Sequence, residues 1–470
     1  MKISAMPDAA PLLDIFSCPR CDKAPLEQRA KALRCGGCGT EFPLVSGIPC
    51  LFADPQSSLG EWRNRLHFEL QRLAHNSERL RAELRPADLG ALAKRRLTGL
   101  LAATESHRKA LQKLLAPLDV QSMQASYESH LALRTRLPID QALGTYYANV
   151  HRDWAWGDDE NAASLEQIRH ALVASTPSGN PVDKIGDTLI LGSGASRLAY
   201  DVHMTFNPPR SVALDFNPLL LLIAQSVVSG IPLDLYEFPM APKTIDDVAV
   251  LRTLRAPTPV RNGLSFVLAD VLRAPFCNAS FDTVVTPWLI DIVAEDLPYL
   301  AARINRLLKK GGRWVNFGSL AFEHPQHSRC YSPEETIEIV ERCGFSTPDI
   351  QEAIIPYMCS PASRHGRREL TFTFAAVKSD DAKPPQRSKA LPDWIVTGRE
   401  PVPLLPSFRT QALSTQIYSF IMSLIDGRRS IADMAAILEQ RKLMTRQEAE
   451  PAIRNFLARM YDDSQRRREF

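Results

Sequence analysis

The sequence predicts an α/β protein with a Rossmann-like, largely parallel sheet and smaller modules on either side. Between residues 140 and 378, short apolar runs typical of strands alternate with segments of helical periodicity, which favours parallel strands joined by crossover helices. A length of 470 residues suggests about two to four domains. A cysteine cluster near the N-terminus and a proline-rich stretch near the C-terminus mark off further segments.

Those further segments differ in texture from the central domain. Residues 1–55 are turn-rich and hold the clustered cysteines. Leu and Ala recur at three- and four-residue spacing in residues 56–139, which predicts amphipathic helices. Residues 379–409 read as a Pro-rich linker, and residues 410–470 return to helical periodicity, with a capping-box-like start at Ser430.

Composition excludes several classes of protein. The net charge is only +3, and 45% hydrophobic with 23% charged residues is ordinary for a globular chain, so neither nucleic acid nor a membrane is an expected partner. No apolar run reaches the roughly 18 residues of a membrane helix, and the N-terminus lacks a signal-peptide charge pattern. Four of the nine cysteines fall within residues 18–38, unlike a disulfide scaffold, so we expect a cytoplasmic protein.

The clustered cysteines form two CxxC pairs, Cys18 with Cys21 and Cys35 with Cys38. Two such turns can close a tetrahedron of thiolates around Zn²⁺, and four protein ligands leave no open position, so the metal would be structural. Free buried thiols or redox pairs are the alternative. Cys50 has no partner in the pattern and is expected to be a core residue.

A glycine loop and two acidic strand ends predict an adenosyl site. The apolar run Thr188–Leu191 breaks into Gly192 and Gly194, although a plain strand-to-helix turn would look similar because the closing glycine of GxGxxG is missing. Asp215 ends the next apolar run and suits the ribose hydroxyls. Asp270 ends the third and suits the adenine amino group. Without a phosphate-binding lysine motif, the set favours S-adenosylmethionine (SAM) over NAD or ATP.

The cysteine segment resembles the zinc-ribbon family of small activator subunits that bind tRNA and protein methyltransferases. The resemblance continues through Phe42-Pro43 and Gly47-Ile48-Pro49. It implies a zinc ribbon over residues 1–55 that serves as a helper or docking module attached to a methyltransferase.

Residues of about 145–378 resemble the carnosine N-methyltransferase family. The resemblance implies a Rossmann-like class I SAM-dependent fold in which Gly192, Gly194 and Arg197 hold the methionine part of SAM. Arg197 would pair with its carboxylate, while Asp215 and Asp270 would take ribose and adenine. The matching runs are Val150-His-Arg-Asp-Trp154, LGSGASRLAYDV, ALDFNPLLLLIAQSVV, TPWLIDIV, LLKKGGRWVNFGSL, and Tyr331-Ser-Pro-Glu-Glu with Gly344-Phe345.

The same resemblance implies that Asp291 accepts an N–H from the acceptor's imidazole. A carboxylate on one ring nitrogen fixes the tautomer and leaves the other lone pair free to attack the methyl group. A helix-capping or ion-paired structural acid is the alternative. The family's His after the following strand corresponds to either Glu323 or His324.

Two segments depart from the family. Where the family is rich in Tyr, this chain has Arg364, Arg367 and Arg368, which would either bind an acidic acceptor's carboxylate or lie in a solvated loop. Residues 241–262 are interpreted as a lid or insertion near the SAM pocket. Both departures leave the identity of the acceptor open.

The C-terminal segment resembles small winged-helix modules that bind peptides and accompany peptide-modifying enzymes. DNA binding is the rival interpretation, but mixed charges such as Asp426 beside Arg428 favour a protein or peptide contact.

The function expected from these features is SAM-dependent N-methylation of an imidazole in a histidine-containing peptide or small metabolite. One alternative is methylation of a protein or ribosomally made peptide docked by the C-terminal module. The other is a non-catalytic SAM-binding scaffold. The expected partners are the acceptor and a protein bound through the zinc ribbon or the C-terminal module.

Overall fold

The computed structural model describes residues 12–120, 148–175, 184–383 except 294 and 325, and 401–466. The chain divides into two compact units, Met1–Arg387 and Ser388–Phe470. None of the described helices is both long and apolar enough to cross a membrane. The finer segment boundaries given above stay predictions.

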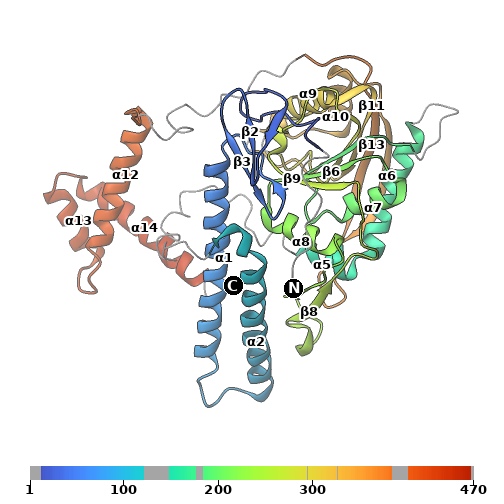
Figure 1. Cartoon of the computed structure of the whole chain (residues 1–470). Coiled ribbons are helices and arrows are strands. Elements are labelled where there is room, and N and C mark those ends of the chain that lie inside the picture. Colours follow the sequence, from blue (N-terminus) through green and yellow to red (C-terminus); the bar gives the residue numbers. More distant parts are fainter. Residues whose placement is uncertain are drawn as a thin grey trace. The chain divides into compact units, whose positions relative to one another are not determined.

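A seven-stranded sheet forms the centre of the first unit (Figure 1). In the order β12-β13-β11-β10-β5-β6-β9, six strands run in the same direction and β13 alone is antiparallel to its neighbours, which confirms the mixed α/β, Rossmann-like fold. Connections from β5 run toward β9, whereas those from β10 run the other way, so the order reverses between β5 and β10. The strands are β5 Thr188–Leu191, β6 Ser211–Asp215, β9 Leu264–Leu268, β10 Phe281–Pro287, β11 Leu308–Gly318, β12 Asp349–Tyr357 and β13 Arg367–Val377.

Helices cover both faces of this sheet, which explains why its central strands are continuous apolar runs. On one face, Ile190 and Ala213 pack in the same core as α6 Asp158–Ala174, α7 Arg197–Phe206 and α8 Pro218–Val228. Their neighbours Leu189 and Val212 point to the other face and pack with α9 Leu297–Leu307 and α10 Pro333–Arg342.

The cysteine segment folds as a four-stranded antiparallel sheet and covers the edge strand β9. The backbone N–H of Leu51 donates to the Leu268 carbonyl at 2.7 Å, and the Phe16 ring stacks on Phe276 with 5.8 Å between centroids. Only the short 3-10 turn Val271–Arg273 lies between β9 and β10, so the ribbon supplies the layer there. Its strands are β1 Leu26–Gln28, β2 Ala32–Cys35, β3 Glu41–Val45 and β4 Ile48–Pro49.

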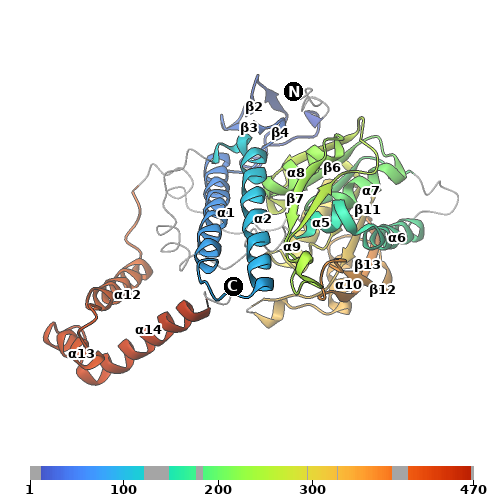
Figure 2. The same ribbon diagram turned by 90° about the horizontal axis from the view of Figure 1, so that it is seen from below.

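The amphipathic helices predicted after the cysteines are present as a long hairpin. Helices α1 (Pro55–Glu83) and α2 (Ala91–Leu114) lie side by side in both views (Figures 1 and 2). Within the first unit, the hairpin packs near the end of β6 through Trp62, whose ring lies 5.5 Å from that of Phe216. The remainder of the predicted helical segment, residues 121–139, lies outside the described residues.

The segment interpreted as a lid or insertion contributes one strand to a separate, two-stranded sheet. Strands β7 (Leu233–Glu237) and β8 (Val250–Leu254) pair antiparallel. Arg252 pairs with Glu237 at 2.8 Å, and the Ser360 hydroxyl donates to the same carboxylate. This hairpin is therefore tied to the connection between β12 and β13.

The second unit is a three-helix module with its own small core. Its helices are α12 Pro406–Ser423, α13 Ile431–Gln440 and α14 Arg446–Arg466. Ser430 and Asp433 form the predicted capping box at the start of α13. Residues 401–466 contain no strand, so the described part of this unit has helices without the wing of a winged-helix module; residues 384–400 lie outside the description.

Candidate functional site

A cavity of about 310 Å³ opens at the carboxyl ends of the parallel strands, where the strand order reverses. Open α/β sheets bind their ligands at this place because loops from adjacent strands diverge there. Its wall is formed by the loops after β5, β6, β9, β10 and β11, by helical residues 149–164, and by the ends of β12 and β13.

The predicted glycine loop and Asp215 meet in this cavity. The Gly194 N–H donates to Asp215 Oδ2 and the Asn217 N–H donates to Oδ1, both at 2.8 Å. Gly192 has φ +67°, and a Cβ there would lie 2.6 Å from Leu289 Cδ1, so only glycine fits. Burial raises the pKa of Asp215 to about 6, although the backbone N–H groups oppose the shift.

Asp291 lines the same cavity from the loop after β10. Its Oδ2 accepts from the Ser319 hydroxyl at 2.5 Å and from the Ala321 N–H at 3.1 Å. No described residue donates to Oδ1. Asp291 therefore has a structural contact to the loop after β11 and a second oxygen available to a ligand.

Four other predicted residues do not line the cavity. Arg197 is buried against acids: its Nε donates to Asp201 at 3.0 Å, and its Nη1 donates to the Asp153 carbonyl at 2.7 Å. Asp270 is exposed and caps the turn before Leu272, whose N–H donates to it at 2.9 Å. The exposed Glu323 and the half-buried His324 lie in the loop after β11, where His324 Nδ1 accepts from the Gln326 N–H.

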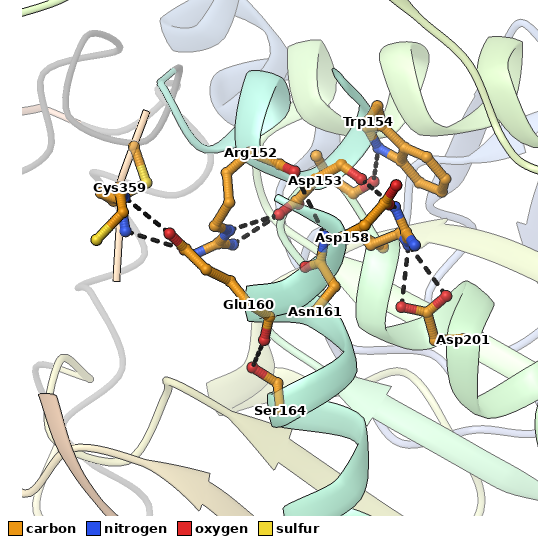
Figure 3. A network of polar contacts seen from close by, with 12 residues as sticks. Arg152, Asp153, Trp154, Asp158, Glu160, Asn161, Ser164, Asp201 and Cys359 are labelled. Carbon is orange, nitrogen blue, oxygen red and sulfur yellow. Dashed lines mark hydrogen bonds and ion pairs between the residues drawn. The ribbon is translucent and has the colours of Figure 1, made fainter. Parts of the chain in front are cut away.

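A polar network that the sequence did not reveal forms another part of the cavity wall (Figure 3). Arg152 donates through Nε and Nη2 to Asp153 Oδ1, at 2.9 and 2.7 Å. Burial disfavours the charged guanidinium, but the neighbouring Asp153 carboxylate outweighs it and the pKa of Arg152 is raised. The run Val150–Trp154 was the only signal for this wall, and it carried no residue role.

Glu160 on α6 fixes another part of that wall. Its carboxylate accepts the backbone N–H groups of Met358 at 2.9 Å and Cys359 at 2.7 Å (Figure 3). Met358 has φ +55°, a left-handed conformation that the two bonds stabilise. The end of β12, including Tyr357 in the cavity wall, is thereby held on α6.

The four clustered cysteines come together outside this cavity. All four Sγ atoms lie within 4.8 Å of one another, with 3.6 Å between Cys18 and Cys38 and 3.5 Å between Cys21 and Cys35. Tetrahedral Zn–S bonds of about 2.3 Å place sulfurs roughly 3.8 Å apart, so the thiolates fit a structural metal. The N–H of Gly37 also donates to Cys35 Sγ at 3.3 Å.

Comparison with known proteins places the cavity in a recognised type of domain. The family model of carnosine N-methyltransferase matches residues 138–365, a little under half of the chain, and that span holds all of the lining residues except Arg367. No curated protein matches the chain. The family match supports a SAM-dependent methyltransferase, as expected from the sequence.

Three solved structures are similar at low identity. A SAM-dependent methyltransferase from Thermotoga maritima is 15% identical with a TM-score of 0.27, over 47% of this chain and 91% of that chain. Phosphoethanolamine N-methyltransferase 2 from Haemonchus contortus, solved with S-adenosylhomocysteine, is 17% identical with a TM-score of 0.31, over 48% and 54%. The complex of the Haloferax volcanii Trm112 methyltransferase activator with a methyltransferase gives 15% identity and a TM-score of 0.30, over 50% and 98%.

The raised pKa of Asp215 predicts a pH dependence of stability. The folded state binds this proton more tightly than the unfolded state, so the free energy of unfolding falls as pH rises from about 4 to about 6. In urea titrations, the stability of wild type relative to Asp215→Asn should therefore decrease across that range, by at most about 3 kcal/mol. A stability difference between wild type and Asp215→Asn that stays constant across that range would contradict the assignment.

Proposed function

We propose that the chain is an N-methyltransferase that binds SAM in the cavity at the ends of β5, β6 and β10. The observation that carries the proposal is the bond from the Gly194 N–H to buried Asp215, which brings the loop and the acid together where the strand order reverses. A carboxylate has about four acceptor sites, so each oxygen of Asp215 can still accept from a ribose hydroxyl.

Arg152, rather than Arg197, is proposed to hold the methionine carboxylate of SAM. Arg152 lines the cavity, and its Nη1 donates to no described residue, whereas Arg197 is taken up by Asp201 and lies outside the lining. A guanidinium that donates to one carboxylate through Nε and Nη2 still has N–H donors on Nη1 for a second carboxylate. Asp270 does not line the cavity itself, but it remains the proposed adenine contact because the next residue, Val271, does.

Asp291 is proposed to orient the acceptor. When bound, SAM supplies a methyl carbon on a sulfonium, and in-line attack by nitrogen forms the N–C bond as the C–S bond breaks, leaving S-adenosylhomocysteine. Oδ1 of Asp291 would accept the N–H of an imidazole, so that the other ring nitrogen presents its lone pair. Glu323 and His324 lie outside the lining, so acceptor contact is assigned to Asp291 and Ser319.

Calorimetry and a methyl-transfer assay test the function together. Wild type should bind SAM and methylate an imidazole compound. Asp291→Asn should leave the affinity for SAM within about twofold, because the proposed SAM contacts are made by other residues. It should lower kcat by about 10²–10⁴-fold, because the acceptor would no longer be oriented. Asp159→Asn, an exposed acid outside the cavity, is the control and should match wild type. Failure of wild type to bind SAM, or unchanged turnover by Asp291→Asn, would overturn the proposal.

We also propose that Cys18, Cys21, Cys35 and Cys38 hold one structural Zn²⁺ that keeps the ribbon on β9. Elemental analysis should find one zinc per wild-type chain. Cys35→Ser should lose the metal and lower the melting temperature, since a four-ligand site contributes directly to folding. Cys50→Ser is the matched control, because Cys50 is equally buried but outside the cluster. Equal zinc content in both variants would exclude the assignment.

A further inference from the structure

We propose that Arg367 binds an anionic group, specifically a carboxylate, on the methyl acceptor. The inference rests on the proposed function and deepens it: the site would take a molecule with a nucleophilic nitrogen near Asp291 and a negative charge near Arg367. Both residues line the same cavity.

Several acids in the cavity wall already accept hydrogen bonds from the protein, whereas one of the two arginines there has no assigned ligand. Asp153 is paired with Arg152, Glu160 accepts two backbone N–H groups, and Asp215 accepts two more. Arg152 and Arg367 are the cationic residues of the lining, and Arg152 is assigned to the methionine carboxylate. Arg367 is therefore the cation available to the acceptor.

The only ion pair that Arg367 makes with a described residue is easily exchanged. Its partner is Glu369, two residues along the same strand, and the Arg367 side chain is 60% exposed. Exposed ion pairs of this kind contribute at most about 1 kcal/mol, because water competes for both charges. A carboxylate entering at the cavity mouth could replace Glu369 at small cost and be bound by two parallel N–H donors.

The guanidinium of Arg367 is held in position by an aromatic ring. Arg367 lies directly opposite Tyr357 in the β12–β13 ladder, and its guanidinium carbon is 4.6 Å from the centre of the Tyr357 ring. Arg152 also lies against that ring, at 5.6 Å, and Trp288 packs on it with 4.8 Å between centroids. Cation–π contact orients the charge without neutralising it.

The strand carrying Arg367 is itself anchored. Glu160 binds the backbone just after Tyr357, and the ladder pairs Tyr357 with Arg367. The distance from the first turn of α6 to the arginine is therefore set by the Glu160 side chain and by the β12–β13 ladder rather than by a free loop. Such preorganisation lowers the entropy cost of binding a charged group. This is the feature expected of a specificity residue.

The experiment compares matched acceptors that differ only in charge: β-alanylhistidine and its C-terminal amide, and imidazole acetate and its amide. Wild type should use each carboxylate with a KM about five- to twentyfold lower than the amide, and the preference should shrink at high ionic strength. Arg367→Gln should abolish the preference by raising KM for the carboxylates alone. Arg368→Gln is the control, because its side chain leaves the opposite face of the strand and should preserve the preference.

Three outcomes would overturn the inference. Equal use of acid and amide by wild type, or the same loss in Arg368→Gln, would remove the role of Arg367 while leaving the methyltransferase assignment intact. SAM binding, measured by calorimetry in the same samples, without methylation of any of the four compounds would reject the acceptor class and Arg367 with it. Absence of SAM binding would instead reject the proposed function itself.

Discussion

The bond between the Gly194 N–H and the Asp215 carboxylate is the contact on which the site depends. It joins the loop after β5 to the end of β6, two parallel strands whose carboxyl ends meet at the reversal of strand order. The carboxylate is buried at a cost that raises its pKa, and backbone N–H groups offset part of that cost. Stability alone poorly explains why a buried acid at the reversal of strand order keeps unused acceptor sites on its oxygens. The proposed contact with the ribose hydroxyls of SAM explains it well.

The N-terminal ribbon covers the edge strand β9, which the seven-stranded sheet would otherwise leave exposed. Strand β9 is the edge of the sheet, and the chain passes from β9 to β10 with only one 3-10 turn between them. Such an edge would expose apolar surface and unpaired backbone groups. The ribbon covers it through Phe16 and Leu51, so its contact face is occupied by this chain's own domain. The cysteine cluster lies in the segment that covers the edge of the sheet, and its four residues do not line the cavity.

Sequence patterns were reliable where a single physical cause determines the structure. Fully buried strands such as β5 and β6 are mainly apolar runs, which makes them recognisable in the sequence. Asp215 could be predicted to lie at the site because it ends one of these runs. Strand β12 was missed because most of its residues are exposed or half-buried, so Asp349–Tyr357 carries no buried run. The hairpin β7–β8 was missed for the same reason, and only its position in the chain suggested an insertion.

The arginine that would bind the methionine carboxylate of SAM could not be identified from the sequence. Arg197 directly follows the glycine loop, yet it is buried against Asp201, whereas Arg152 reaches the cavity from a π-helical turn that lies earlier in the chain than the loop. Only tertiary packing decides which of the two faces the ligand. A crystal structure with S-adenosylhomocysteine tests this account most directly. The account predicts ribose hydroxyls on Asp215 and the methionine carboxylate on Arg152. A ligand bound outside the cavity, or with its carboxylate on Arg197, would contradict it.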